Sequence, residues 1–189
     1  AEFIEINWDS KEIELNAKNI DCIWNGMTIT DDRKANMEIT VPYMENKQVM
    51  VVKKENLEKY SEGVIGAAVV AEQGSAGETL ALEDEFFKDV AFTAVGAQAN
   101  ALMDVASGTA DIAIVDYVLS IGSIGEGTDY ADLVVVDTKD FSPEQYGIAF
   151  RKGSDMATVV NNTIDELIAD GTLDTIAAKY KLADLLIKD

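Results

Sequence analysis

The sequence predicts an α/β fold of two lobes, each built on a mostly parallel sheet. Strand and helix signals alternate along the 189 residues. Several strand signals are continuous apolar runs, which suit strands that are buried on both faces of a parallel sheet. Each of the two prolines, Pro42 and Pro143, precedes an extended segment, as proline does where helical structure must end. The chain is therefore expected to pass twice between two lobes.

The expected elements begin close to the first residue. Residues 2–7 alternate in the manner of a strand, and residues 9–12 (DSKE) match a capping box. The helix that this box opens is expected to turn Ile13, Ala17 and Ile20 inward. Further strands are expected at residues 21–24, 39–43, 48–52, 64–71, 90–95, 111–115, 132–137 and 146–150. Further helices are expected at residues 76–87, 98–107 and 154–171, and from residue 172 onwards.

Composition excludes several classes of function. The formal net charge is −20, so the long-range field repels nucleic acids and anionic membranes. The chain has no histidine, which excludes histidine-dependent catalytic triads and most zinc sites. Its one cysteine, Cys22, lies in an expected strand and fits a buried structural thiol. No apolar run reaches the roughly 20 residues that cross a bilayer, and no signal peptide opens the sequence, as in a trimmed secreted protein.

The segment at residues 26–33 (GMTITDDR) has the features of a small-anion site. It leaves the strand at residues 21–24 and enters a short helix, for which Thr30 is a good N-cap. Gly26 lets the backbone approach whatever lies above the strand end. Arg33 offers a planar fork of donors that can bind a carboxylate through two hydrogen bonds. An ordinary turn with a solvated arginine fits the same spacing.

Five short motifs occur in order along the chain, at residues 26–33, 41–43 (VPY), 73–75 (QGS), 111–116 (DIAIVD) and 145–153 (QYGIAFRKG). Together they resemble the polar amino-acid substrate-binding proteins of ABC importers, from residue 2 to about residue 180. The resemblance implies the class II periplasmic-binding-protein fold, whose two lobes close like a flytrap around a ligand. We expect residues 1–45 with 146–189 to form the first lobe and residues 46–145 to form the second.

The resemblance also implies roles for individual residues. Arg33 would bind the α-carboxylate of the ligand, assisted by the backbone N–H groups of Thr28 and Ser75. Asp116 would accept the α-ammonium group, which the carbonyl of Gly26 would share. These places agree with the rule that ligands of open α/β sheets bind beyond the carboxyl ends of the strands. Considered alone, Asp116 fits a helix N-cap better than a ligand-binding residue.

Four further residues are expected to select the ligand side chain, namely Trp8, Asn25, Glu72 and Gln73. Trp8 holds the place where relatives put an aromatic residue that stacks on the ligand, although a core tryptophan fits nearly as well. An acid at Glu72 favours a cationic or amide-bearing ligand side chain, unless it points to solvent. No catalytic residue, metal ligand or cofactor is expected.

One part of the family pattern is missing. Relatives carry a strand and a helix before the position of Ala1, with aromatic and acidic ligand contacts, so the first lobe is expected to be N-terminally incomplete. We expect that the strands at residues 2–7 and 21–24 pair directly, or that a second copy covers the gap as a homo-oligomer or by strand exchange. Ligand binding would then be weak or absent.

The sequence therefore predicts the extracytoplasmic binding component of an ABC importer, not an enzyme, which delivers a polar amino acid to a membrane permease. It would work in the periplasm or as a cell-surface lipoprotein of a Gram-positive organism. Its hinge is expected near residues 46–48 and 145–147. Two alternatives use the same fold, a ligand-sensing receptor domain and a cyclohexadienyl dehydratase-like enzyme whose pocket carboxylates act as general acids. Ligand turnover separates the enzyme from a binding protein.

Overall fold

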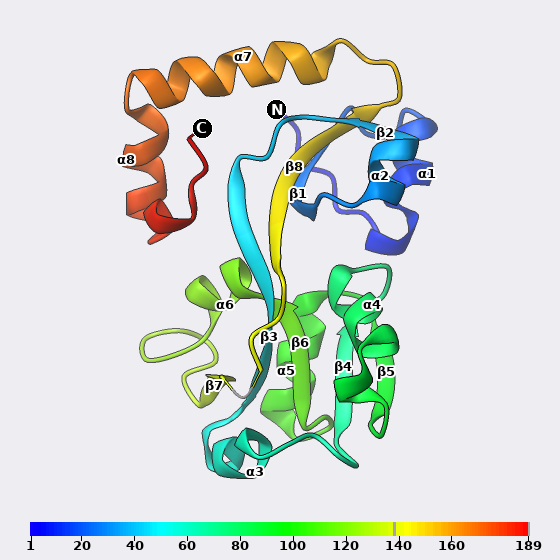
Figure 1. Cartoon of the computed structure of the whole chain (residues 1–189), viewed down its shortest axis with the longest axis vertical. Coiled ribbons are helices and arrows are strands. Elements are labelled where there is room, and N and C mark those ends of the chain that lie inside the picture. Colours follow the sequence, from blue (N-terminus) through cyan, green and yellow to red (C-terminus); the bar gives the residue numbers. More distant parts are fainter. Residues whose placement is uncertain (138, 189) are drawn as a thin grey trace. The chain divides into compact units, whose positions relative to one another are not determined.

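The computed structural model describes residues 1–137 and 139–188 and divides the chain into two compact units. Unit 1 consists of Ala1–Ile6, Ser10–Asn46 and Pro143–Asp189, and unit 2 consists of Asn7–Asp9 and Lys47–Ser142. Apart from the three residues Asn7–Asp9, the chain therefore passes from unit 1 to unit 2 after Asn46 and returns before Pro143. Figure 1 labels the elements of both units.

In unit 1 the central strand is β8 (Pro143–Arg151). It pairs antiparallel with β1 (Ile23–Thr28) and with β2 (Met37–Ile39). Because Ala149 is opposite both Ile23 and Ile39, the two strands lie on opposite edges of β8. The other elements of unit 1 are η1 (Trp8–Ser10, which it shares with unit 2), α1 (Lys11–Asn16), α2 (Asp31–Asn36), α7 (Met156–Ala169), α8 (Thr172–Lys179) and η4 (Ala183–Leu185).

One hydrophobic cluster of unit 1 lies between β8 and α7. Ile148 and Phe150 of β8 pack with Ala157 and Ile164 of α7, which are seven residues apart and so share one face of the helix. Cys22 packs partly buried against this cluster. Burial, and to a lesser degree the negative charge of Asp21, raises the pKa of its thiol. The thiol is therefore neutral at pH 7, as befits a structural cysteine.

Two expectations for the start of the chain are wrong. Residues 2–7, all of which the structure describes, form no strand, and Phe3 is 97% exposed. Alternation alone does not make a strand, because a strand is stabilised where its apolar face is buried, and Phe3 and Ile4 are both exposed. In α1, Ile13 is 69% exposed while Leu15 is fully buried. The helix spans only six residues, and its inward face is the one that Lys11 and Leu15 share at i, i+4.

The edge of β1 that faces away from β8 is where the expected gap in unit 1 can be examined. Within the described part of the chain, β1 pairs with β8 alone, and Trp24 on this strand is 60% exposed. The expected direct pairing of residues 2–7 with β1 is therefore wrong. An unpaired strand edge can accept another strand. Covering of this edge by a second copy of the chain stays a prediction.

Unit 2 is built on a mixed sheet with the strand order β3-β6-β4-β5 and with β7 beside β3. The strands are β3 (Met44–Lys53), β4 (Ala68–Glu72), β5 (Ala91–Val95), β6 (Ile112–Asp116) and β7 (Leu133–Val136). β4 pairs parallel with β5 and with β6, whereas β3 pairs antiparallel with β6 and with β7. The α/β class is confirmed, but among the strands of the described residues the parallel pairs are those of β4 with β5 and with β6. An apolar run indicates that a strand is buried on both faces, but it does not show whether the neighbouring strand is parallel or antiparallel.

The central strands of unit 2 are buried on both faces, as their apolar runs predict. Met50 and Val52 of β3 point into one hydrophobic cluster, and Val49 and Val51 point into the other. The first cluster is covered by residues of α3 (Leu57–Ser61), α4 (Ala76–Glu83) and η3 (Glu85–Phe87). The second is covered by α5 (Gln98–Ser107) and by residues of α6 (Tyr117–Ser123). The short η2 (Lys54–Asn56) follows β3.

Candidate functional site

In unit 1, Arg33 is a buried cation whose position is fixed by the segment before it. Thr30 is the N-cap of α2, and its Oγ1 accepts a hydrogen bond from the backbone N–H of Arg33 at 3.2 Å, which confirms the expected cap. The guanidinium Nη1 donates to the carbonyl oxygen of Thr28 at 2.6 Å, and Arg33 is 9% exposed. A solvated arginine on an ordinary turn is therefore the wrong alternative. The fork is held against the end of β1.

The end of β1 is joined to residues next to both points where the chain passes between the units. The Oγ1 of Thr28 donates to Oε2 of Glu144 at 3.0 Å, and the side-chain amide of Asn46 donates to the same oxygen at 3.1 Å. Glu144 is the second residue of β8, and Asn46 is the last residue of unit 1 on β3. One carboxylate therefore links the expected ligand-binding strand end to both crossing points. No local sequence pattern marks Glu144, because it lies 116 residues away from Thr28.

Gly26 lies within β1, where the register with β8 is irregular between Ile23 and Met27. Its φ is +61°, a conformation that favours glycine. A Cβ at this position would lie 3.1 Å from Cε2 of Tyr146, so the aromatic ring of β8 packs where a side chain would be. Asn25 beside it is exposed. The glycine thus allows the close approach that was expected, and the group that approaches is Tyr146.

In unit 2, Asp116 ends β6 and is held by two glutamines. Its Oδ1 accepts from Nε2 of Gln48 at 2.6 Å, and its Oδ2 accepts from Nε2 of Gln98 at 2.6 Å. Its backbone N–H donates to Oε1 of Gln98 at 2.9 Å. Asp116 stands at the N-cap position of α6, but within the described residues its side chain caps no helix N–H. Asp116 is thus the N-cap residue of α6, as the alternative expected, and its carboxylate is held by the two glutamines.

Ser75 is a buried N-cap of α4. Its Oγ accepts from the N–H of Glu78 at 3.1 Å, and the Glu78 carboxylate accepts from the N–H of Gly74 at 2.7 Å. These reciprocal bonds resemble a capping box and fix the turn after β4. The N–H of Ser75, which was expected to face a ligand carboxylate, donates to the carbonyl of Glu72 at 3.2 Å. A ligand carboxylate that accepted from the Ser75 N–H would replace the carbonyl of Glu72 as its hydrogen-bond partner.

The remaining expected residues lie beside this turn. Gln73 is exposed, and its amide donates to Oδ2 of Asp9 at 3.3 Å. Trp8, next to Asp9, is buried. Glu72 ends β4 and is partly buried. Unit 1 thus gathers Asn25, Gly26, Thr28 and Arg33, and unit 2 contains Trp8, Glu72, Gln73, Ser75 and Asp116.

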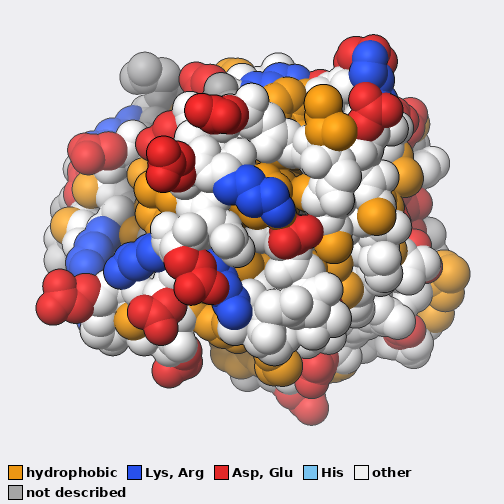
Figure 2. Space-filling view, turned by 90° about the horizontal axis from the view of Figure 1, so that it is seen from below, with side chains coloured by type: hydrophobic (Ala, Val, Ile, Leu, Met, Phe, Trp, Pro, Cys, Tyr) orange, Lys and Arg blue, Asp and Glu red, His pale blue; other side chains and the backbone are white. Residues whose placement is uncertain are grey.

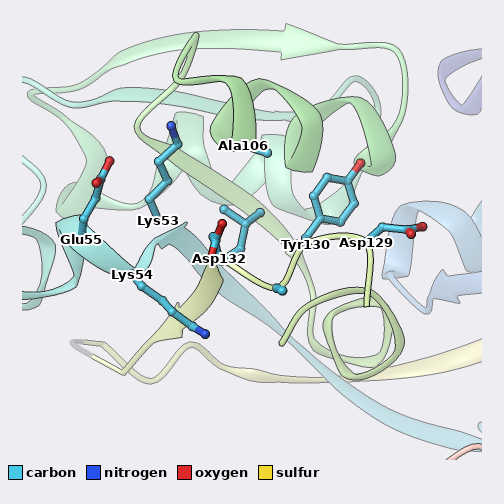
Figure 3. A pocket seen from close by; sticks show the side chains of 9 residues that line it. Lys53, Lys54, Glu55, Ala106, Asp129, Tyr130 and Asp132 are labelled. Atoms are coloured by element: carbon cyan, nitrogen blue, oxygen red, sulfur yellow. The ribbon is translucent and has the colours of Figure 1, made fainter. Parts of the chain in front are cut away.

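A separate hollow of about 540 Å³ lies in unit 2 and includes none of the expected site residues. It is lined by Lys53, Lys54, Glu55, Ala106, Asp129, Tyr130, Ala131, Asp132 and Leu133. Charges of both signs surround it, and Lys53 and Lys54 point in different directions (Figure 3). Because these charged side chains do not point toward one place, they offer no defined partner to a polar ligand group. This hollow is therefore a weaker candidate than the residues around Arg33 and Asp116.

The surface and the acidic residues give no competing site. On the face drawn in Figure 2, basic side chains are interspersed with acidic ones and form no continuous basic patch. Within residues 1–137 and 139–188, no cluster of three or more acidic or cysteine residues could hold a metal ion. A search of the same residues finds no helix with the length and apolar character that a membrane span requires.

These features define a class of protein: the fold is that of class II periplasmic binding proteins, with one buried cation and one oriented carboxylate at strand ends. A solved structure of the ancestral amino acid-binding protein AncCDT-1, a precursor of cyclohexadienyl dehydratase, is similar with a TM-score of 0.81. That protein is 30% identical, and the match covers 95% of this chain and 77% of the other.

The chain belongs to the bacterial extracellular solute-binding proteins, family 3, whose family model matches residues 1–183. It is 33% identical to a probable histidine-binding protein of Neisseria gonorrhoeae, over 95% of this chain and 67% of that protein. It is 30% identical to the L-arginine-binding protein of Pseudomonas aeruginosa, over 95% of this chain and 72% of that protein. The chain thus spans about two thirds of the length of these relatives.

Proposed function

We propose that this protein binds a polar amino acid outside the cytoplasm and delivers it to an ABC permease. A free amino acid is a zwitterion and needs one fixed cation and one fixed anion. Arg33, anchored on the Thr28 carbonyl, would take the α-carboxylate through its planar fork. Asp116, oriented by two amides, would take the α-ammonium group. What carries the proposal is that a chain of a solute-binding family holds a buried cation in unit 1 and an oriented carboxylate in unit 2.

The other expected residues complete the proposed site. The N–H groups of Thr28 and Ser75 would assist Arg33, and the carbonyl of Gly26 would assist Asp116. The ligand side chain would meet Trp8, Asn25, Glu72 and Gln73. Partly buried Glu72 favours a cationic or amide-bearing side chain, in keeping with the names of the arginine-binding and histidine-binding relatives. The setting would be the periplasm or the outer surface of a Gram-positive cell.

An enzyme is the second candidate, and one comparison favours it. The structural relative AncCDT-1 is described as a precursor of cyclohexadienyl dehydratase. Binding proteins and dehydratases on this fold differ in what happens to the ligand, so recovery of the ligand decides between them. If a bound amino acid is recovered unchanged after prolonged incubation with the protein, binding alone is supported. Its conversion to a product would favour the enzyme.

The proposal predicts that at least one amino acid stabilises the protein against heat. A ligand that binds only the folded state at 100 times its Kd adds about 2.7 kcal/mol. For a chain of this length we expect the Tm to rise by about 5–10 °C. The measurement is a thermal-shift screen of the twenty amino acids with ornithine, citrulline and cystine. If none of them raises the Tm at millimolar concentration, the expectation of weak or absent binding by an N-terminally incomplete first lobe holds, and the proposed function fails for this chain alone.

We further propose that the ligand shifts a hinged equilibrium between the two units. The hinge would bend near residues 46–48 and 145–147, close to the points where the chain passes between the units. Asn46 and Glu144, which are joined through the carboxylate that also holds Thr28, give ligand binding a direct link to this region. Solution scattering with the ligand from the screen should show a smaller radius of gyration. An unchanged radius at proven saturation would contradict closure.

A further inference from the structure

The carboxylate of Asp116 receives one hydrogen bond on each oxygen from an uncharged amide. Gln48 donates to Oδ1 and Gln98 donates to Oδ2, both at 2.6 Å. Gln98 makes a second hydrogen bond with Asp116, because its Oε1 accepts from the backbone N–H of Asp116 at 2.9 Å. Its amide thus bridges the main chain and the side chain of Asp116, which fixes the rotamer of the aspartate.

The fold explains why these two glutamines reach Asp116. Gln48 is directly opposite Asp116 in the antiparallel ladder of β3 and β6, so both side chains leave the sheet on the same face. Gln48 is buried, which restricts its side chain further. Gln98 is the first residue of α5 and reaches the carboxyl end of β6 from there. Two different elements of unit 2 therefore hold one carboxylate.

Amides suit the task that the proposed function gives to Asp116. A lysine or arginine in their place would orient the carboxylate equally well, but its charge would compete with the α-ammonium group of a ligand. An amide donates a hydrogen bond and adds no charge. The two amides donate to different oxygens of the carboxylate. The amides therefore orient the group without neutralising it.

We propose that Gln98, with Gln48, is a positioning residue that holds Asp116 in the orientation required to recognise the α-ammonium group of an amino acid. The inference rests on the proposed function. It predicts a specific defect: loss of the Gln98 amide weakens binding of ligands that carry an α-ammonium group and spares ligands that lack it. A residue that only supports the fold would weaken both kinds of ligand equally.

The test compares Gln98→Met, which keeps the length of the side chain and removes the amide, with the wild type. The probes are the amino acid of highest affinity in the thermal-shift screen and its des-amino analogue. For L-arginine the analogue is 5-guanidinopentanoate, and for L-glutamine it is glutaramate. By calorimetry we expect Gln98→Met to lower the affinity for the amino acid about tenfold and to change that for the analogue less than about twofold. Asn100→Ala, an exposed polar change on the same helix, should leave both affinities unchanged.

The outcomes separate the two proposals. If the amino acid binds the wild type and Gln98→Met keeps the wild-type preference for it over the analogue, the positioning role is wrong and the proposed function stands. If no amino acid binds the wild type, the proposed function fails and the inference fails with it. The Tm of the unliganded variant gives a further check. If Gln98→Met weakens the amino acid and the analogue equally and also melts at a lower temperature, Gln98 supports the fold only.

Discussion

Replacing Arg33 with alanine should abolish or strongly weaken amino-acid binding. Removing one partner of a buried, hydrogen-bonded charge pair costs about 2–5 kcal/mol, which is roughly 30-fold to 5000-fold in Kd. Arg33→Lys keeps the charge and loses the planar fork, so we expect an intermediate affinity. Calorimetry with the ligand from the screen measures both variants. An Arg33→Ala protein whose affinity stays within about tenfold of the wild type would show that Arg33 does not bind the carboxylate.

The chain's other arginine, Arg151, provides a matched control. Its Nη1 donates to the carbonyl of Ile20 at 2.8 Å and to that of Leu15 at 3.2 Å. These contacts tie β8 to the segment around α1, so Arg151→Ala should lower the Tm of the free protein. It should leave the affinity of the folded protein nearly unchanged. Arg33→Ala should show the opposite pattern, a large loss of affinity with a smaller change of Tm.

The sequence predicted the fold class and most of unit 2 because its signals there are local. Apolar runs such as residues 111–115 become strands buried on both faces, and Thr30 caps α2 as its spacing indicated. The start of the chain was predicted wrongly because alternation makes a strand only where one face is buried, and Phe3 and Ile4 are exposed. Residues 2–7 have the alternation of a strand, yet the structure pairs β8 with β1 and β2 instead.

The candidate site residues were also predicted where the sequence signal is local and missed where the contact is distant in sequence. Arg33 and Asp116 could be named because each lies in a recognisable motif at a strand end. Gln48, which donates to Asp116, and Glu144, which accepts from Thr28, could not be named, because tertiary structure brings these pairs together across 68 and 116 residues. Gln48 would have been found if the antiparallel pairing of β3 with β6 had been foreseen, since that pairing places it directly opposite Asp116.

A second large effect is expected from Gly147→Ala, which adds a methyl group where β8 has no room. The new Cβ would lie 2.6 Å from Cγ2 of Ile39 and 2.9 Å from Cδ1 of Ile29. Overpacking of this kind costs about 1–3 kcal/mol. At about 2–4 °C per kcal/mol, the loss is measurable as a lower Tm by calorimetric scanning. Because Ile29 lies between Thr28 and Thr30, we also expect ligand binding to weaken.

Two further variants separate crowding from a general effect of alanine. Ile39→Ala removes the Cγ2 atom that the new methyl group would meet, so the double mutant should be more stable than the sum of the two single changes by about 0.5–3 kcal/mol. Gly122→Ala makes the same substitution in α6, where nothing lies within 4 Å, and should stabilise the helix by about 0.5–1 kcal/mol. A Gly147→Ala protein that melts at the wild-type temperature would show that Ile29 and Ile39 can move aside without cost. Gly147 would then have no part in fixing the segment that carries Thr28 and Arg33.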